Sequence, residues 1–406
     1  MVQSVLGSLT LGYRPLWNAA RHLAAIQLYV QDDPVAAVDA AHLLRTVQEL
    51  WDGNSPPLLI SPLSHQLLFN LLEHAPRGSP WIEVRGDWLS DSAIYSRVEA
   101  AHRRGLKMVW RGELSHLPPT AVASFFDNSL LSLSPQEAMA ALQAGTAPGK
   151  RGSPVLDRQM YENLPNAALA GHCLDQHQAV AIAGWPAEDV LYGLRHKQLQ
   201  PAHASVLKLM KAIDAEQSIE ALEQILGEEP LLAYRFMLYT NSAALGLRTG
   251  VDSLRRGLVM LGYSTLKRWL ADQLPHATQE PDLQPIRESM VLRARLAERL
   301  IEAGVGHDLR REVYLMGLFS QLSELLREPQ GAVLRRLPLS ERIVTATLQQ
   351  SGPYAGVLEM ACALENDDAK VIQQLCEKHQ FNPETVNRAL LRVLSELVVQ
   401  RPAAAS

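Results

Sequence analysis

Residues 227–270 read GEEPLLAYRFMLYTNSAALGLRTGVDSLRRGLVMLGYSTLKRWL. Pro230 suits the first turn of a helix, because the N–H that proline lacks would have no partner there. After it, apolar residues recur every three or four positions and share one helix face: Leu232, Phe236 and Tyr239. The stretch therefore predicts a buried helix that begins at Pro230.

This predicted helix is followed by Asn241 and Ser242, whose short polar side chains can bond to the backbone groups left free where a helix ends. Gly246 then permits a turn that other residues would strain. Two interpretations stay open: the Asn-Ser pair shapes the local fold, or it is an exposed element to which a partner docks. Asn241, Ser242 and Gly246 are therefore candidate binding residues.

The sequence after about residue 199 has helical periodicity and no strand pattern. Further amphipathic segments are predicted at residues 204–213, 218–226, 251–260, 264–274 and 286–303. Ser218 is expected to cap its helix alone, because Ala221 stands where a capping box needs Glu or Gln. Asp252 or Ser253 suits the cap of the next helix. We therefore predict an all-α second half.

The first half alternates short β-rich runs with helical patterns. The runs are residues 24–30, 57–61, 81–85, 106–110, 129–133 and 179–182. Between them, residues 35–51 and 94–104 show helical periodicity, and Gly105 stands where a helix stop is expected. Repeated βα units predict a mostly parallel sheet, and their number favours a (β/α)8-like barrel.

Length and composition bound the class of protein. A chain of 406 residues exceeds the roughly 250 to 300 residues that one core supports, so we expect an α+β multidomain protein with domains at 1–195 and 196–406. The net charge of -5, without a long basic run, gives no indication of nucleic-acid binding.

The cysteines Cys173, Cys362 and Cys376 are odd in number and far apart, which argues against a disulfide framework. The ligand-capable residues near the first of them, His172, Asp175 and His177, match no zinc spacing. Without a signal peptide or a stretch of about 20 apolar residues, no membrane association is expected, and we expect a cytoplasmic protein.

The segment quoted first resembles the HDOD family. The resemblance rests on Glu229-Pro230-Leu231, Asn241-Ser242-Ala243 with Gly246, Ser253-Leu254 and Leu261-Gly262. HDOD domains are similar to HD-type metal phosphohydrolases, and that relationship implies a Gly-Leu-Leu-His-Asp-Ile-Gly helix. Here Ser320 and Gln321 occupy the ligand positions, and neither is a strong metal ligand. The resemblance thus implies an all-α interaction domain without hydrolase activity.

The first half resembles EAL-type cyclic-di-GMP phosphodiesterase barrels, beginning with YRPLWN at residues 13–18. The resemblance places Gln27 in the strand that carries the family's metal-binding glutamate, and Ile60 or Ser61 where a metal ligand is expected. Glu83 is the one carboxylate retained, while Trp110 and Arg111 replace paired aspartates. Two-metal hydrolysis needs several converging carboxylates, so the sequence predicts no catalytic residues, metal site or cofactor.

Two functions follow as expectations. The first is a non-catalytic scaffold, a degenerate EAL barrel joined to an HDOD module that binds other signalling proteins in cyclic-di-GMP-linked motility, attachment or virulence. The alternative is a sensor whose barrel binds a cyclic dinucleotide without hydrolysing it, with Arg85 and Arg111 approaching phosphates at the strand ends. Solvated or ion-paired roles for these two arginines are the competing interpretation.

Overall fold

A computed structural model describes residues 5–33, 39–144, 152–245, 250–301 and 306–399. The chain forms two compact units. One consists of Met1–Asp189 together with Ala363–Ser406, and the other of Val190–Cys362. We call them the barrel unit and the helical unit.

The barrel unit is discontinuous in sequence, whereas the expected domains were the continuous ranges 1–195 and 196–406. The first boundary lies close to the expected one, but residues 363–406 belong with the barrel. The helical unit is therefore an insertion between the last barrel strand and two C-terminal helices. Helical periodicity alone could not show this, because it does not say which core a helix covers.

The barrel unit contains a closed sheet of eight strands in sequence order. The strands are β1 (Leu9–Trp17), β2 (Leu23–Asp32), β3 (Leu58–Pro62), β4 (Trp81–Arg85), β5 (Met108–Glu113), β6 (Asn128–Ser132), β7 (Met160–Glu162) and β8 (Ala181–Ala183). Strand β1 runs antiparallel to both β2 and β8, and the other neighbouring pairs are parallel. A (β/α)8-like barrel was expected, with its closure left open. The sheet is closed, but β1 and β2 form a hairpin, so alternation of strands and helices begins only after β2.

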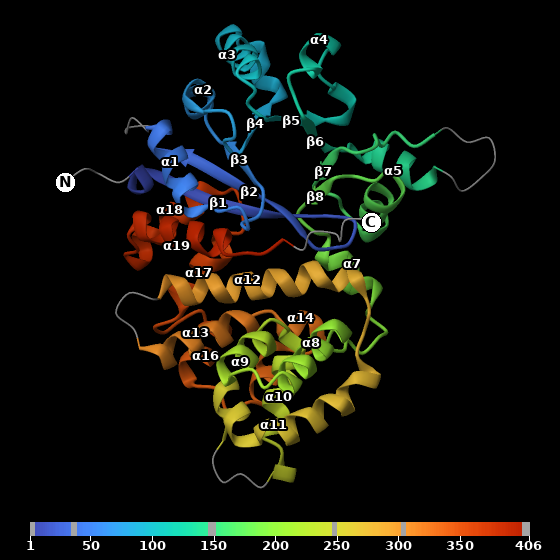
Figure 1. Cartoon of the computed structure of the whole chain (residues 1–406), viewed down its shortest axis with the longest axis vertical. Helices are drawn as coiled ribbons and strands as arrows, with labels where there is room; N and C mark the ends of the chain where they lie inside the picture. Colours follow the sequence, from blue (N-terminus) through green and yellow to red (C-terminus); the bar gives the residue numbers. More distant parts are fainter. Residues whose placement is uncertain (1–4, 34–38, 145–151, 246–249, 302–305, 400–406) are drawn as a thin grey trace. The chain divides into compact units, whose positions relative to one another are not determined.

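Helices follow most of the later strands, and α1 to α3 lie outside the sheet (Figure 1). They are α1 (Ala40–Leu50), α2 (His65–His74), α3 (Ser92–Arg103), α4 (Thr120–Ala123), α5 (Pro135–Gln143), α6 (Ala167–Gly171) and α7 (Ala187–Gly193). Asp39, Ser64 and Asp91 accept backbone N–H bonds at the starts of the first three. Each such cap satisfies a donor that the helix leaves free.

The C-terminal helices α18 (Ala369–His379) and α19 (Pro383–Ser395) pack on β1. The buried amide of Asn387 accepts from the N–H of Leu11 at 3.2 Å and donates to the carbonyls of Leu6 and Leu9, each at 2.8 Å. Because β1 pairs with β8 only at Leu16 and Trp17, the rest of its outer edge would otherwise lack hydrogen bonds. Residues 363–399 therefore complete the barrel unit.

The helical unit confirms the predicted all-α half, since its described residues contain no β-strand. Its helices are α8 (His203–Asp214), α9 (Ile219–Gly227), α10 (Pro230–Thr240), α11 (Leu254–Gln273), α12 (Gln284–Leu300), α13 (His307–Phe319), α14 (Leu322–Leu326), α15 (Gln330–Leu334), α16 (Glu341–Leu348) and α17 (Ala355–Ala363). Ser218 and Ser253 are N-caps, as expected. The segments predicted at 251–260 and 264–274 form the two arms of α11, which bends at Gly262 (φ 65°).

No helix in the part of the chain that the structure describes combines the length and apolar character needed to cross a membrane.

Candidate functional site

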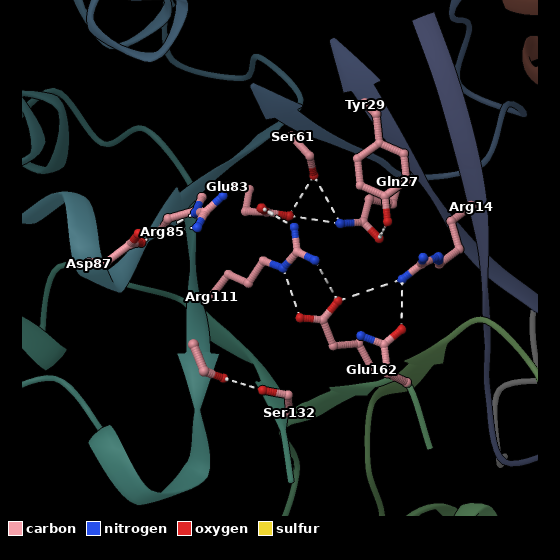
Figure 2. Close-up of polar contacts among 12 residues, drawn as sticks. Arg14, Gln27, Tyr29, Ser61, Glu83, Arg85, Asp87, Arg111, Ser132 and Glu162 are labelled. Atoms are coloured by element: carbon pink, nitrogen blue, oxygen red, sulfur yellow. Dashed lines mark hydrogen bonds and ion pairs between the residues drawn. The ribbon is translucent and has the colours of Figure 1, made fainter. Parts of the chain in front are cut away.

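The candidate site is a layer of polar side chains inside the barrel, toward the ends of its parallel strands (Figure 2). An apolar layer lies beneath it and consists of Leu16, Ala25, Leu59, Val109, Leu130, Met160, Ala181 and Ala183. Side chains in a strand alternate between two faces, so the residue two positions further along points into the barrel as well. The polar layer follows from this alternation: Gln27, Ser61, Arg111 and Glu162 each stand two residues after a member of the apolar layer.

Arg111 of β5 is held between two carboxylates. Its Nε and Nη2 atoms donate to the two oxygens of Glu162 on β7 at 2.8 and 2.9 Å. Its Nη1 donates to Oε1 of Glu83 on β4 at 3.1 Å. The side chains of Glu83 and Glu162 are only 1% and 5% exposed. Both carboxylates are therefore compensated by the same guanidinium in a nearly dry environment.

The other oxygen of Glu83 is also occupied. Gln27 donates from Nε2 to Oε2 of Glu83 at 2.8 Å, and the Ser61 hydroxyl donates to the same oxygen at 2.5 Å. The hydroxyl of Tyr29 donates to Oε1 of Gln27 at 3.0 Å. All four of these side chains are buried, so the network is satisfied by its own members.

Arg14 of the antiparallel strand β1 completes the layer. Its Nη1 lies 3.7 Å from Oε2 of Glu162 and donates to Oδ1 of Asn163 at 3.2 Å. Its guanidinium carbon lies 5.5 Å from the centre of the Tyr29 ring, within cation–π range. Two arginines thus face two glutamates in this layer.

The protonation states of Arg111 and Tyr29 are fixed by their surroundings. Burial acts to lower the pKa of Arg111, but the Glu83 carboxylate and the hydrogen-bonded Glu162 outweigh it and raise that pKa above its ordinary value. Burial raises the pKa of Tyr29 well above its usual range, and the nearby arginines only partly oppose this. The site therefore holds a permanent cation and a neutral phenol at physiological pH.

The structure separates the two predicted arginines. Arg111 lies in the network, whereas Arg85 at the end of β4 has a side chain 45% exposed that pairs with Asp87 at 3.1 Å and lies over the Trp88 ring. Trp110 points to the other side of β5, where it packs against Gly86 and Gly112. Of these three side chains, only that of Arg111 therefore belongs to the polar layer (Figure 2).

Glu162 and Arg14 were not predicted as site residues. Strand β7, which carries Glu162, is three residues long and too short for an alternating pattern to reveal. The signal that could have found it was a lone charged residue after the apolar pair Met160–Tyr161. Its partner Arg111 is 51 residues away in sequence, so nothing local pairs the two.

Other ligand-capable residues do not converge. Among the described residues, no group of three or more His, Cys, Asp or Glu side chains is arranged to hold a metal ion. In the cluster near Cys173, the ring of His172 bonds to Ser153 at 2.8 Å and that of His177 to Asp157 at 2.7 Å. In the helical unit, the Ser320 hydroxyl donates to the carbonyl of Gly317 at 2.7 Å.

Asn241 holds together two parts of the helical unit. Its side chain donates to the carbonyls of Met237 and Val251 at 2.8 and 2.9 Å, and accepts from the N–H of Val251 at 2.7 Å. It thereby ties the end of α10 to the segment before α11. The Ser242 hydroxyl is buried without a hydrogen-bond partner among the described residues. Gly246 lies outside the described residues, and the partner-binding role of all three stays a prediction.

We expect Asn241→Ala to lower the free energy of unfolding by about 2 kcal/mol, because the N–H and the carbonyl of Val251 lose their side-chain partner and the Met237 carbonyl loses one of its donors. Ser242→Ala should change it by less than about 0.5 kcal/mol, since the hydroxyl has no bond to lose. Urea denaturation of the two single variants measures both values. Equal destabilisation would contradict the structural role assigned to the Asn241 amide.

Comparisons with known proteins identify a family for part of the helical unit. The family model described as the HDOD domain matches residues 199–329, so this part of the helical unit is an HDOD domain, as predicted. The chain is 20% identical to the cyclic di-GMP phosphodiesterase CdgJ of Vibrio cholerae over 199 residues, covering 49% of this chain and 46% of that protein. It is 23% identical to the uncharacterized protein YuxH of Bacillus subtilis over 195 residues, covering 47% of each.

The chain spans about half the length of these two relatives. Among solved structures, the MmoQ response regulator of Methylococcus capsulatus is similar with a TM-score of 0.39 and 17% identity, covering 48% of this chain and 98% of that one.

Proposed function

We propose that this chain is a non-catalytic signalling protein in which a degenerate EAL-like barrel and an HDOD domain act through other signalling proteins. The observation that carries the proposal is Arg111, whose guanidinium lies between Glu83 and Glu162. The HDOD match and the name of one relative, a cyclic di-GMP phosphodiesterase, support a place in cyclic-di-GMP signalling.

The chemistry of the polar layer supports the absence of turnover. By resemblance, Gln27, Ser61 and Arg111 stand at or beside the positions of metal ligands in EAL barrels. A guanidinium repels divalent cations, and the amide and hydroxyl already bond to Glu83. Two-metal hydrolysis requires several carboxylates with oxygens free to bind the ions. Both carboxylates of this layer are instead bound to protein donors.

The same contacts count against the nucleotide-sensor alternative. A phosphate recognised by Arg111 would have to displace Glu162 from a bidentate pair and leave that buried carboxylate with only Arg14 at 3.7 Å, a cost of several kcal/mol. Arg85 is paired with Asp87 outside the network. We therefore place the scaffold function ahead of the sensor function.

We expect the full chain to form no linear dinucleotide from cyclic-di-GMP with either Mg²⁺ or Mn²⁺. Product analysis by chromatography measures this, with a Glu83→Gln variant as control for a contaminating enzyme. Product formed by the natural chain and lost in the variant would refute the proposal. Titration calorimetry with the same nucleotide separates the two non-catalytic functions, and heat at micromolar ligand would favour the sensor.

A further inference from the structure

A groove of about 1310 Å³ opens on the barrel unit at the end where strands begin. Leu58 and Trp81, the first residues of β3 and β4, line it, and so do Val398 and Val399 after α19. The polar layer lies toward the opposite ends of these parallel strands. The groove is therefore separate from the candidate site.

Among the described residues, the cations of this groove have no ion-pair partner within 4 Å, and Arg45 acts on the Asp39 carboxylate only at longer range. Arg45, Arg77 and Lys107 line it with exposed side chains, and in the described part of the chain none of the three forms an ion pair or a side-chain hydrogen bond. Asp52 is the one carboxylate among the described residues that line the groove. One of its oxygens already accepts from the N–H groups of Asn54 and Ser55 at 2.7 and 3.0 Å.

Two arginines on neighbouring helices do form ion pairs, unlike the cations of the groove. On the neighbouring helices, Arg97 pairs with Glu73 at 3.2 Å and Arg103 pairs with Glu99 at 2.5 Å. These two arginines are therefore neutralised by nearby carboxylates. The three groove cations therefore leave a local positive charge on a chain whose net charge is -5.

Part of the groove lining is apolar. Trp51 and Trp81 are half-buried in it, and the indole N–H of Trp51 is fixed by a 2.7 Å bond to the carbonyl of Pro56. Val398 is 75% exposed. Three lining prolines, at positions 57, 76 and 80, have no N–H to donate, so we expect a bound segment to be recognised by side chains and not by strand addition.

We propose that this groove binds an acidic segment of a partner protein, with carboxylates toward the three cations and apolar side chains on the two tryptophans. The proposal goes beyond the proposed function, which concerns the polar layer and the HDOD domain. A protein segment fits better than nucleic acid, because three cations offer fewer phosphate contacts than the roughly six to ten that sustain nucleic-acid affinity.

The test is fluorescence anisotropy on the full chain with two labelled synthetic peptides, one of glutamate and leucine and one with glutamine in place of each glutamate. We expect the acidic peptide to bind more tightly, with an advantage that shrinks as salt is raised. Arg77→Gln with Lys107→Gln should weaken its binding about tenfold. A matched pair, Arg103→Gln with Lys370→Gln, removes equal charge outside the groove and should leave binding unchanged.

Equal affinity for the two peptides would overturn the proposal, and so would equal weakening by both pairs of substitutions, since binding would then follow overall charge. Tighter, groove-dependent binding of single-stranded oligothymidylate would assign the site to nucleic acid instead. Because the substitutions lie outside the polar layer, none of these results depends on whether the barrel hydrolyses or binds cyclic-di-GMP.

Discussion

Arg111→Met should lower the free energy of unfolding by about 3 to 5 kcal/mol, because it leaves two buried carboxylates without their cation. Glu83 would retain bonds from Gln27 and Ser61, whereas Glu162 would keep only Arg14 at 3.7 Å. Protonation relieves an uncompensated buried charge. The destabilisation should therefore be largest at neutral pH and should shrink as the pH is lowered.

Urea denaturation at neutral and mildly acidic pH measures this effect. The control is Arg85→Met, which removes an exposed arginine at the end of β4 that is paired with Asp87 two residues later and should cost less than about 1 kcal/mol at either pH. If the two variants were equally stable, the polar layer would not be an ion-paired network, and the principal support for the proposed function would be lost.

Gly12→Ala should destabilise the barrel unit by about 3 kcal/mol. A Cβ atom at this position would lie 2.0 Å from the carbonyl oxygen of Asn366. That oxygen belongs to the backbone, so no change of rotamer relieves the contact. Moving the two segments apart would also break the 2.8 Å bond from the N–H of Tyr13 to the carbonyl of Leu364, which adds about 1 kcal/mol.

Denaturation gives the size of this effect, and limited proteolysis gives its location. We expect new cleavage between residues 363 and 399, because the C-terminal helices would no longer pack tightly against β1. Gly53→Ala is the matched control, since a Cβ atom there meets nothing within 4 Å. Natural stability and an unchanged digestion pattern for Gly12→Ala would show that residues 363–399 are not required by the barrel.

The same contact bears on any experiment with separate domains. A fragment of residues 1–195 lacks Asn387 and exposes the outer edge of β1. Exposed edges of this kind favour aggregation. Residues 1–189 joined to 363–406 by a flexible linker form the better unit for binding studies.

The sequence alone determined the local structure of this protein. Pro230 after Glu229 and the capping serines Ser218 and Ser253 set the starts of helices, because a cap bonds to a backbone group two or three residues away. The β-rich runs likewise predicted six of the eight strands. The residue types at 27, 61 and 111 are likewise read from the sequence, and they supply an amide, a hydroxyl and a guanidinium to the polar layer (Figure 2).

Only the tertiary structure decided how these parts combine. Strand β7 is defined by its neighbours in the closed sheet, and through it Glu162 meets Arg111 from 51 residues away. The C-terminal helices belong to the barrel because Asn387 bonds to the backbone of β1, more than 370 residues earlier in the chain. Contacts of this kind depend on barrel closure and on the packing of distant segments. They cannot be predicted from periodicity, because periodicity describes only residues that are close in sequence.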